Sequence, residues 1–152
     1  MKKLFCTALL ACFMQAVHAQ TTTVPAPHAT ATKEDDTILL ELTATPEASW
    51  QRLAQVLVQR GYSIEHSNKD LLTLSTYPLF VPQSGVLRVA GTVVKNTFYL
   101  RVYWGGNMET GSGPYVLARQ KSEKMWRELE AIAREFGGSI RYTTSAVNID
   151  DR

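Results

Sequence analysis

The stretch TPEASWQRLAQVLVQRGY, residues 45–62, decides the fold because it contains one complete amphipathic helix. Thr45 fits the N-cap, and Pro46 fits the first helical position, where its missing N–H removes no hydrogen bond. Gly61 can take the left-handed conformation that ends a helix. The apolar residues recur at helical spacing in one stripe: Trp50, Leu53, Ala54, Leu57 and Val58. Such a stripe must pack against a second layer.

Runs of alternating apolar residues predict strands on both sides of this helix. The predicted strands are residues 37–44, 62–66, 71–77, 86–94, 97–104 and 139–144. The clearest pair is the hairpin formed by residues 86–94 and 97–104. Its two-residue turn is Lys95-Asn96, and asparagine tolerates the positive φ that such turns require. One face of this hairpin is expected to meet the helices: Leu87, Val89, Val93, Phe98, Leu100, Val102 and Trp104.

A second helix is predicted to begin between Pro114 and Glu123 and to end before Gly137-Gly138. Its apolar stripe is Met125, Leu129, Ile132, Ala133 and Phe136. The order of elements is therefore β-α-β-β-β-β-α-β. We expect a two-layer α+β domain in which two helices pack on one face of an antiparallel sheet.

The ends of the chain predict export. Residues 1–19 combine Lys2 and Lys3 with an apolar run and small residues before Gln20, the pattern of a signal peptide cleaved after Ala19. Residues 20–36 are rich in Thr, Ala and Pro and predict a flexible linker. A single domain over 37–145 and a polar tail over 146–152 follow. The predicted location is periplasmic or secreted.

Cys12 leaves a second interpretation of the export signal open. The run Leu9-Leu10-Ala11-Cys12 resembles a bacterial lipobox, in which the cysteine is lipidated and becomes the new N-terminus. A lipid there would give peripheral membrane association.

Composition excludes several classes of function for the mature chain. Both cysteines, Cys6 and Cys12, lie in the leader, so a cleaved chain would carry neither a disulfide nor a catalytic thiolate. Without Lys2 and Lys3, the chain has 14 basic and 14 acidic residues, so its net charge is near zero. Nucleic-acid binding depends on excess positive charge, so it is not expected.

The run SWQRLAQVLVQRGYSIEHSNKDLLTLSTYP resembles the helix-grip domains of envelope lipoproteins. Among these domains, the run resembles those of the C-component lipoprotein of the bacterial outer-membrane β-barrel assembly machine. The matching positions are Trp50, Leu53, Leu57, Gly61, Tyr62, Ile64 and Thr76. The resemblance covers about 35 residues and implies a helix-grip-like fold and a non-enzymatic accessory role, because core and turn positions carry fold rather than chemistry.

No catalytic or metal-binding constellation is expected. His66, Ser67 and Asp70 are neighbours in or near one turn and are not expected to form a triad. His28 and the acidic run 34–36 are expected to be solvated. The glycine-rich stretch 105–113, GGNMETGSG, lacks the Lys-Ser/Thr of a phosphate loop and predicts a mobile connection. We therefore predict that the protein is not an enzyme and holds no cofactor or metal.

The hairpin face that points away from the helices is the predicted partner-binding site. It carries Tyr99, Arg101 and Tyr103, with Arg88 beside them. Tyrosine and arginine are enriched where proteins bind one another, which favours docking of another envelope protein.

The alternative is a small carrier that holds a lipid or other apolar molecule between helix and sheet. The residues expected to line such a cavity are Trp50, Trp104, Met125, Trp126 and Phe136.

Overall fold

The computed structural model describes residues 25–83, 85–104 and 115–145. The predicted signal peptide with Cys12, the whole glycine-rich stretch 105–113 and the predicted polar tail 146–152 lie outside these ranges. In chain order the elements are β1 (Thr37–Glu41), α1 (Pro46–Gln59), β2 (Ile64–Asn68), β3 (Thr73–Thr76), β4 (Leu79–Val81), β5 (Gly85–Val94), β6 (Thr97–Trp104), β7 (Tyr115–Val116), the 3-10 turn η1 (Arg119–Lys121), α2 (Glu123–Phe136) and β8 (Ile140–Thr143).

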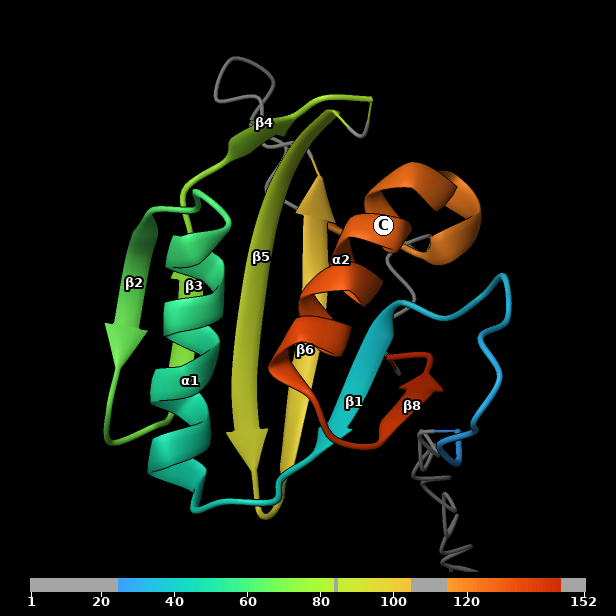
Figure 1. The fold of residues 1–152 in the computed structure, drawn as a ribbon. Coiled ribbons are helices and arrows are strands. Elements are labelled where there is room, and N and C mark those ends of the chain that lie inside the picture. The colour runs from blue at the N-terminus through green and yellow to red at the C-terminus, as the bar shows by residue number, and fades with distance from the viewer. Residues whose placement is uncertain (1–24, 84, 105–114, 146–152) are drawn as a thin grey trace, which may run out of the picture.

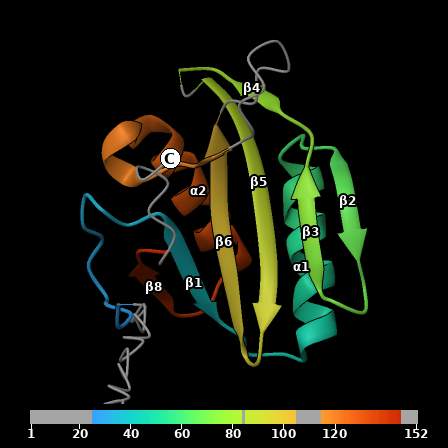
Figure 2. The ribbon, with the colours of Figure 1, turned by 180° about the vertical axis from the view of Figure 1, so that it is seen from behind.

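The fold is the two-layer α+β domain predicted from the sequence. The sheet order is β2-β3-β5-β6-β1-β8, with β4 paired to β5 and β7 paired to β6, and the neighbours run antiparallel. Both helices cover one face of the sheet (Figure 1). The view from behind shows the opposite face with no helix in front of it (Figure 2). We call this opposite face the outer face.

Helix α1 begins and ends as its sequence predicts. The Thr45 hydroxyl accepts a hydrogen bond from the Ala48 N–H at 3.3 Å. At the other end the Tyr62 N–H donates to the Leu57 carbonyl at 2.9 Å, and Gly61 has a φ of +88°, a Schellman arrangement. The predicted apolar stripe is confirmed at Trp50, Leu53, Ala54 and Leu57, which are buried or pack against the core. It is wrong at Val58, which is 57% exposed, and Val56 is buried instead.

Helix α2 begins at Glu123, where the Ser122 hydroxyl caps the Met125 N–H. Its predicted stripe is confirmed and is widened by Trp126: the buried residues are Met125, Trp126, Leu129, Ile132, Ala133 and Phe136. The helix is tied to α1 at its C-terminal end, where Arg52 Nε donates to the Phe136 carbonyl at 2.8 Å. A cation at free helix carbonyls is favourable because of the helix dipole.

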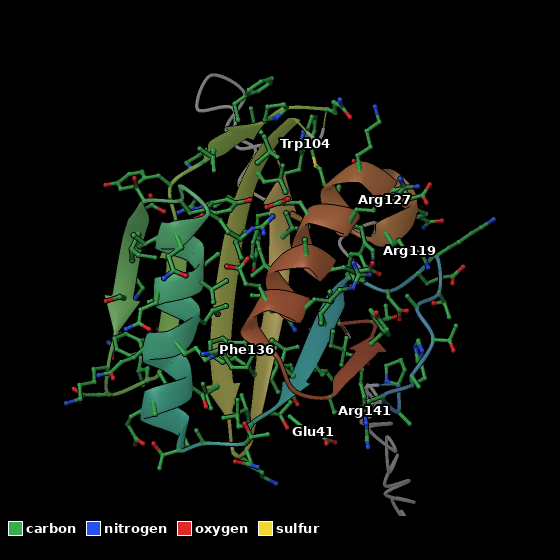
Figure 3. All side chains as sticks on the ribbon, viewed as in Figure 1. Glu41, Trp104, Arg119, Arg127, Phe136 and Arg141 are labelled. Carbon is green, nitrogen blue, oxygen red and sulfur yellow. The ribbon has the colours of Figure 1, made fainter. Side chains whose placement is uncertain are left out.

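The β5–β6 hairpin confirms the predicted inner face except at Trp104. Leu100 and Val102 are fully buried, but Trp104 is 45% exposed at the end of β6 (Figure 3). The turn also differs from the prediction, because Lys95 has the positive φ, +56°. Asn96 instead donates from its side chain to the Leu42 carbonyl at 3.2 Å, which ties the turn to the chain after β1.

The prediction of a flexible linker over 20–36 is wrong for its described part, residues 25–36. The backbones of His28 and Tyr142 exchange hydrogen bonds of 3.0 and 2.9 Å beside β8. Asp35 is fully buried, where it accepts from the Thr32 N–H at 2.6 Å and contacts His28 Nε2 at 3.0 Å. The polar composition predicted that this segment would not be buried. Asp35 is nevertheless buried beside the sheet edge because its carboxylate forms hydrogen bonds with His28 and Thr32.

Candidate functional site

The predicted binding residues lie together on the outer face. In the β5–β6 register Thr92 opposes Tyr99, Ala90 opposes Arg101, and Arg88 opposes Tyr103. Directly opposed residues of an antiparallel pair share one face. Phe98, Leu100 and Val102 between them are fully buried against the helices, so Tyr99, Arg101 and Tyr103 point the other way, as the period of a strand requires.

A hollow of about 350 Å³ lies on this part of the outer face. We call it the Tyr–Arg groove; its lining residues are Ala90, Thr92, Val94, Tyr99, Arg101 and Tyr103. The small side chains of Ala90 and Thr92 on β5 lie opposite the long ones of Arg101 and Tyr99 on β6. This difference in size between the two strands produces the hollow.

Arg101 is held in the groove by a chain of hydrogen bonds from the N-terminal side of the domain. Its Nε donates to the Thr37 hydroxyl at 2.9 Å, and that hydroxyl donates to Asp36 Oδ1 at 2.7 Å. Asp36 is itself buried and accepts from the Ser145 N–H at 2.8 Å and from the Ser145 hydroxyl. Sequence analysis missed these partners, because contacts across more than 60 positions leave no local pattern.

Arg88 lies on the outer face but outside the groove lining. Its Nη2 bonds to the Glu65 carboxylate, and its Nε donates to the Thr76 carbonyl at 3.2 Å. Arg141, at the other side of the sheet, pairs with Glu41 at 3.1 Å (Figure 3). Among the described residues Arg101 has no carboxylate within salt-bridge distance, so it differs from both of these arginines.

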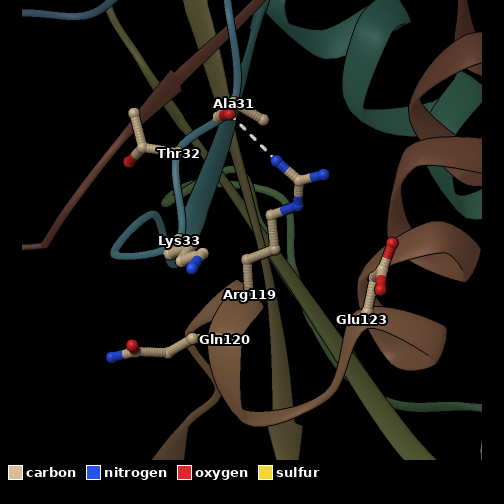
Figure 4. A pocket seen from close by; sticks show the side chains of 6 residues that line it. All are labelled: Ala31, Thr32, Lys33, Arg119, Gln120 and Glu123. Carbon is tan, nitrogen blue, oxygen red and sulfur yellow. Dashed lines mark hydrogen bonds between the residues drawn. The ribbon is translucent and has the colours of Figure 1, made fainter.

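A larger hollow, of about 630 Å³, lies between the N-terminal segment and the start of α2. Figure 4 shows Arg119 reaching across it, where Nη1 donates to the Ala31 carbonyl at 2.9 Å. Lys33 and Glu123 also line it. Glu123 is exposed, and Arg127 holds the pKa of its carboxyl below the ordinary value by a hydrogen bond and by charge. The bond from Arg119 to Ala31 joins the N-terminal segment to the domain. None of the described residues that line the hollow has a buried side-chain N or O atom without a hydrogen-bond partner.

A third hollow, of about 430 Å³, lies between the helices and β4, with Arg60 and Glu128 on its wall. Arg60 donates to Glu128 at 2.7 and 3.0 Å and to Glu135 at 2.9 Å. Burial opposes the charge of Arg60, but the bonds to Glu128 and Glu135 raise its pKa overall. Burial first, and the nearby Glu128 charge next, raise the pKa of Tyr62. The cluster joins α1 to α2.

The remaining sequence candidates are not brought together. His66 and Ser67 are successive residues of β2, and successive strand side chains point to opposite faces. Of the large side chains expected around an apolar cavity, Met125, Trp126 and Phe136 instead fill the core, Trp50 packs against it, and Trp104 is exposed. Trp126 is 1% exposed, and the Phe136 ring packs edge-on against Phe98 with centroids 5.9 Å apart.

Across residues 25–83, 85–104 and 115–145, no three histidine, cysteine or acidic side chains gather into a metal site. The two helices of this part of the chain are both too short and too polar to span a bilayer.

Comparison with known proteins adds no family. No protein-family model and no curated protein sequence matches the chain. The resemblance to envelope lipoprotein domains therefore stays a prediction.

Proposed function

We propose that the protein is an exported, non-enzymatic accessory domain of the bacterial cell envelope that docks another envelope protein through the Tyr–Arg groove. The observation that carries the proposal is the hollow between β5 and β6, where Tyr99, Arg101 and Tyr103 stand beside Ala90 and Thr92. Aromatic rings and an arginine beside a hollow give a partner apolar area and directed hydrogen bonds together.

Export and the envelope location are supported by the sequence of residues 1–19. Cleavage after Ala19 would release a soluble domain into the periplasm or the medium. Lipidation of Cys12 would instead hold the domain at a membrane surface, facing envelope partners. The mass of the mature chain distinguishes these two products.

An apolar carrier is the second function considered, and no observation among the described residues favours it. Trp50 donates from its ring N–H to the Thr73 carbonyl at 3.1 Å, and Trp126 donates to Glu130 at 3.1 Å. Trp126 is part of the buried core, and Trp50 packs against that core. Purified protein that released a bound lipid on denaturation would support the carrier over the docking function.

The docking function is tested by the double variant Tyr99→Ala with Arg101→Ala. We expect the circular dichroism spectrum to be retained, since both side chains lie outside the helix-facing core, and a co-purifying envelope protein to be lost. The matched control is Gln55→Ala with Arg127→Ala, two exposed positions on the helices, which should retain the partner. Equal recovery of the partner with both variants would contradict the proposal.

A further inference from the structure

Arg88 and Arg141 on the outer face each pair with a carboxylate, whereas among the described residues no carboxylate lies within salt-bridge distance of Arg101. Arg88 bonds to Glu65, and Arg141 bonds to Glu41. The described contact of Arg101 is the one from its Nε to the Thr37 hydroxyl. A guanidinium carries five N–H donors. Among residues 25–83, 85–104 and 115–145, this contact uses one of them, and the four on the terminal nitrogens have no partner in that part of the chain.

Asp36 holds Arg101 in place through Thr37, without an observed hydrogen bond to the terminal nitrogens of Arg101. Thr37 is fully buried, and its hydroxyl stands between Asp36 and Arg101 Nε. The Asp36 oxygens are occupied by Thr37 and by Ser145. The Asp36 carboxylate therefore orients the Arg101 guanidinium through the Thr37 hydroxyl, while its own oxygens accept hydrogen bonds from Thr37 and Ser145.

An oriented guanidinium beside tyrosines recognises a carboxylate. The two terminal nitrogens of arginine match the two oxygens of a carboxylate, and such charge-assisted pairs are the stronger hydrogen bonds. The groove runs between β5 and β6, and Thr92 and Ala90 leave room for a chain lying along the strands. Charge complementarity therefore favours an acidic, extended ligand over a purely apolar one.

We propose that the Tyr–Arg groove binds an extended segment of a partner protein through an aspartate or glutamate side chain that pairs with Arg101. This inference rests on the proposed docking function and names the chemistry of the partner. Arg101 contacts the ligand, and Thr37 is a positioning residue that acts through Arg101.

The test is an NMR titration of the domain with two matched peptides, acetyl-Thr-Glu-Thr-Glu-Thr-amide and its glutamine counterpart acetyl-Thr-Gln-Thr-Gln-Thr-amide. We expect the glutamate peptide to shift the amide signals of Ala90, Thr92, Tyr99, Arg101 and Tyr103. Affinity should fall at least about tenfold for the glutamine peptide and for Arg101→Gln, because a charged hydrogen bond is lost. Arg141→Gln on the same face should change it less than about twofold.

Thr37 is tested through the Arg101 side chain itself. Thr37→Val removes the acceptor at nearly constant volume, so the Arg101 Nε–H signal should broaden by solvent exchange and the peptide should bind more weakly. Thr37→Ser should restore both. A purely structural role of Thr37 would leave the Nε–H signal of Arg101 unchanged in the valine variant.

Equal binding of the two peptides, or no loss with Arg101→Gln, would overturn the inference. The same holds if neither peptide binds while the double variant Tyr99→Ala with Arg101→Ala still loses its partner; the docking function would then stand without the acidic contact. If neither peptide binds and that double variant also keeps its partner, the docking function fails with it.

Discussion

Gly91 shows how a single residue sets the spacing between the layers. It lies on β5 beneath α1, and a Cβ at this position would lie 2.4 Å from Phe98 Cε1 and 2.8 Å from Leu53 Cδ2. Both distances are shorter than van der Waals contact. The side chains of helix and sheet interlock above this glycine, so the core has no room for one more carbon.

Gly91→Ala should therefore lower the free energy of unfolding by about 1–3 kcal/mol, the usual cost of overpacking. Urea denaturation measures it. Phe98→Leu removes the closest atoms, so the two changes together should cost less than the sum of the single costs.

The control for Gly91 is Gly61→Ala. Gly61 has no atom within 4 Å of the added carbon but a φ of +88°, so its cost arises from the backbone. That cost should add to the cost of Phe98→Leu. Strict additivity at Gly91 as well would contradict the proposed clash.

Tyr62 is a second residue whose environment makes a measurable prediction. It is buried, and its hydroxyl has no hydrogen-bond partner among the described residues. Burial and the Glu128 charge raise its pKa in the folded state, whereas tyrosine in the unfolded chain titrates near 10. The raised pKa contributes stability that is complete below about pH 10 and is lost as the pH rises above it.

Tyr62→Phe should consequently change stability by less than about 1 kcal/mol at pH 8, because no hydrogen bond is lost. Urea denaturation repeated up to pH 11 should show a steeper loss of stability for the wild type than for the variant. The other tyrosines titrate in both proteins and cancel in this comparison. Parallel curves above pH 10 would argue against the buried, neutral Tyr62 hydroxyl.

Among the elements, the two helices were predictable because their signals are local. Thr45, Pro46 and Gly61 delimit α1, and Ser122 caps α2. The burial of Val56 in place of Val58 on α1 was not predictable, since an apolar face is wide enough to allow either residue inside. The short strands β4 and β7 were not predicted from the sequence, because they form by pairing with β5 and β6, and local pattern does not specify that pairing.

Arg60 is one of two arginines that join α1 to α2, and its loss should be costly. Arg60→Met leaves the part-buried Glu128 without the cation that bonds it twice. An uncompensated part-buried carboxylate should lower the free energy of unfolding by about 1–3 kcal/mol. Arg127→Met is the control, because its pair with Glu123 is exposed on both sides and should matter little. Similar unfolding midpoints for the two variants would contradict this role of Arg60.

At the scale of the whole molecule, the N-terminal segment is part of the domain. Residues 25–36 cover the β8 edge and bring Asp36 to Thr37 and Arg101. An edge strand left open offers free backbone groups to other chains. Strand periodicity predicted the residues of the Tyr–Arg groove. It did not predict that Asp36, which the sequence assigned to a linker, would hold Arg101 through Thr37.

Asp35→Ala tests this attachment. It leaves His28 Nε2 and the Thr32 N–H without their acceptor, so we expect a loss of about 1–3 kcal/mol in unfolding free energy. Hydrogen exchange of the Tyr142 amide should also become faster, because His28 holds it. Glu34→Ala, one residue earlier and exposed, is the control. Unchanged exchange at Tyr142 in the Asp35 variant would contradict the attachment.

The most direct test of the central claim is photo-crosslinking in intact cells of the source organism, with a photoreactive amino acid placed at Thr92 in the groove or at Gln55 on the helix face. The docking account predicts a defined crosslinked envelope protein from position 92 and none from position 55. No adduct at position 92, or the same adducts from both positions, would contradict it.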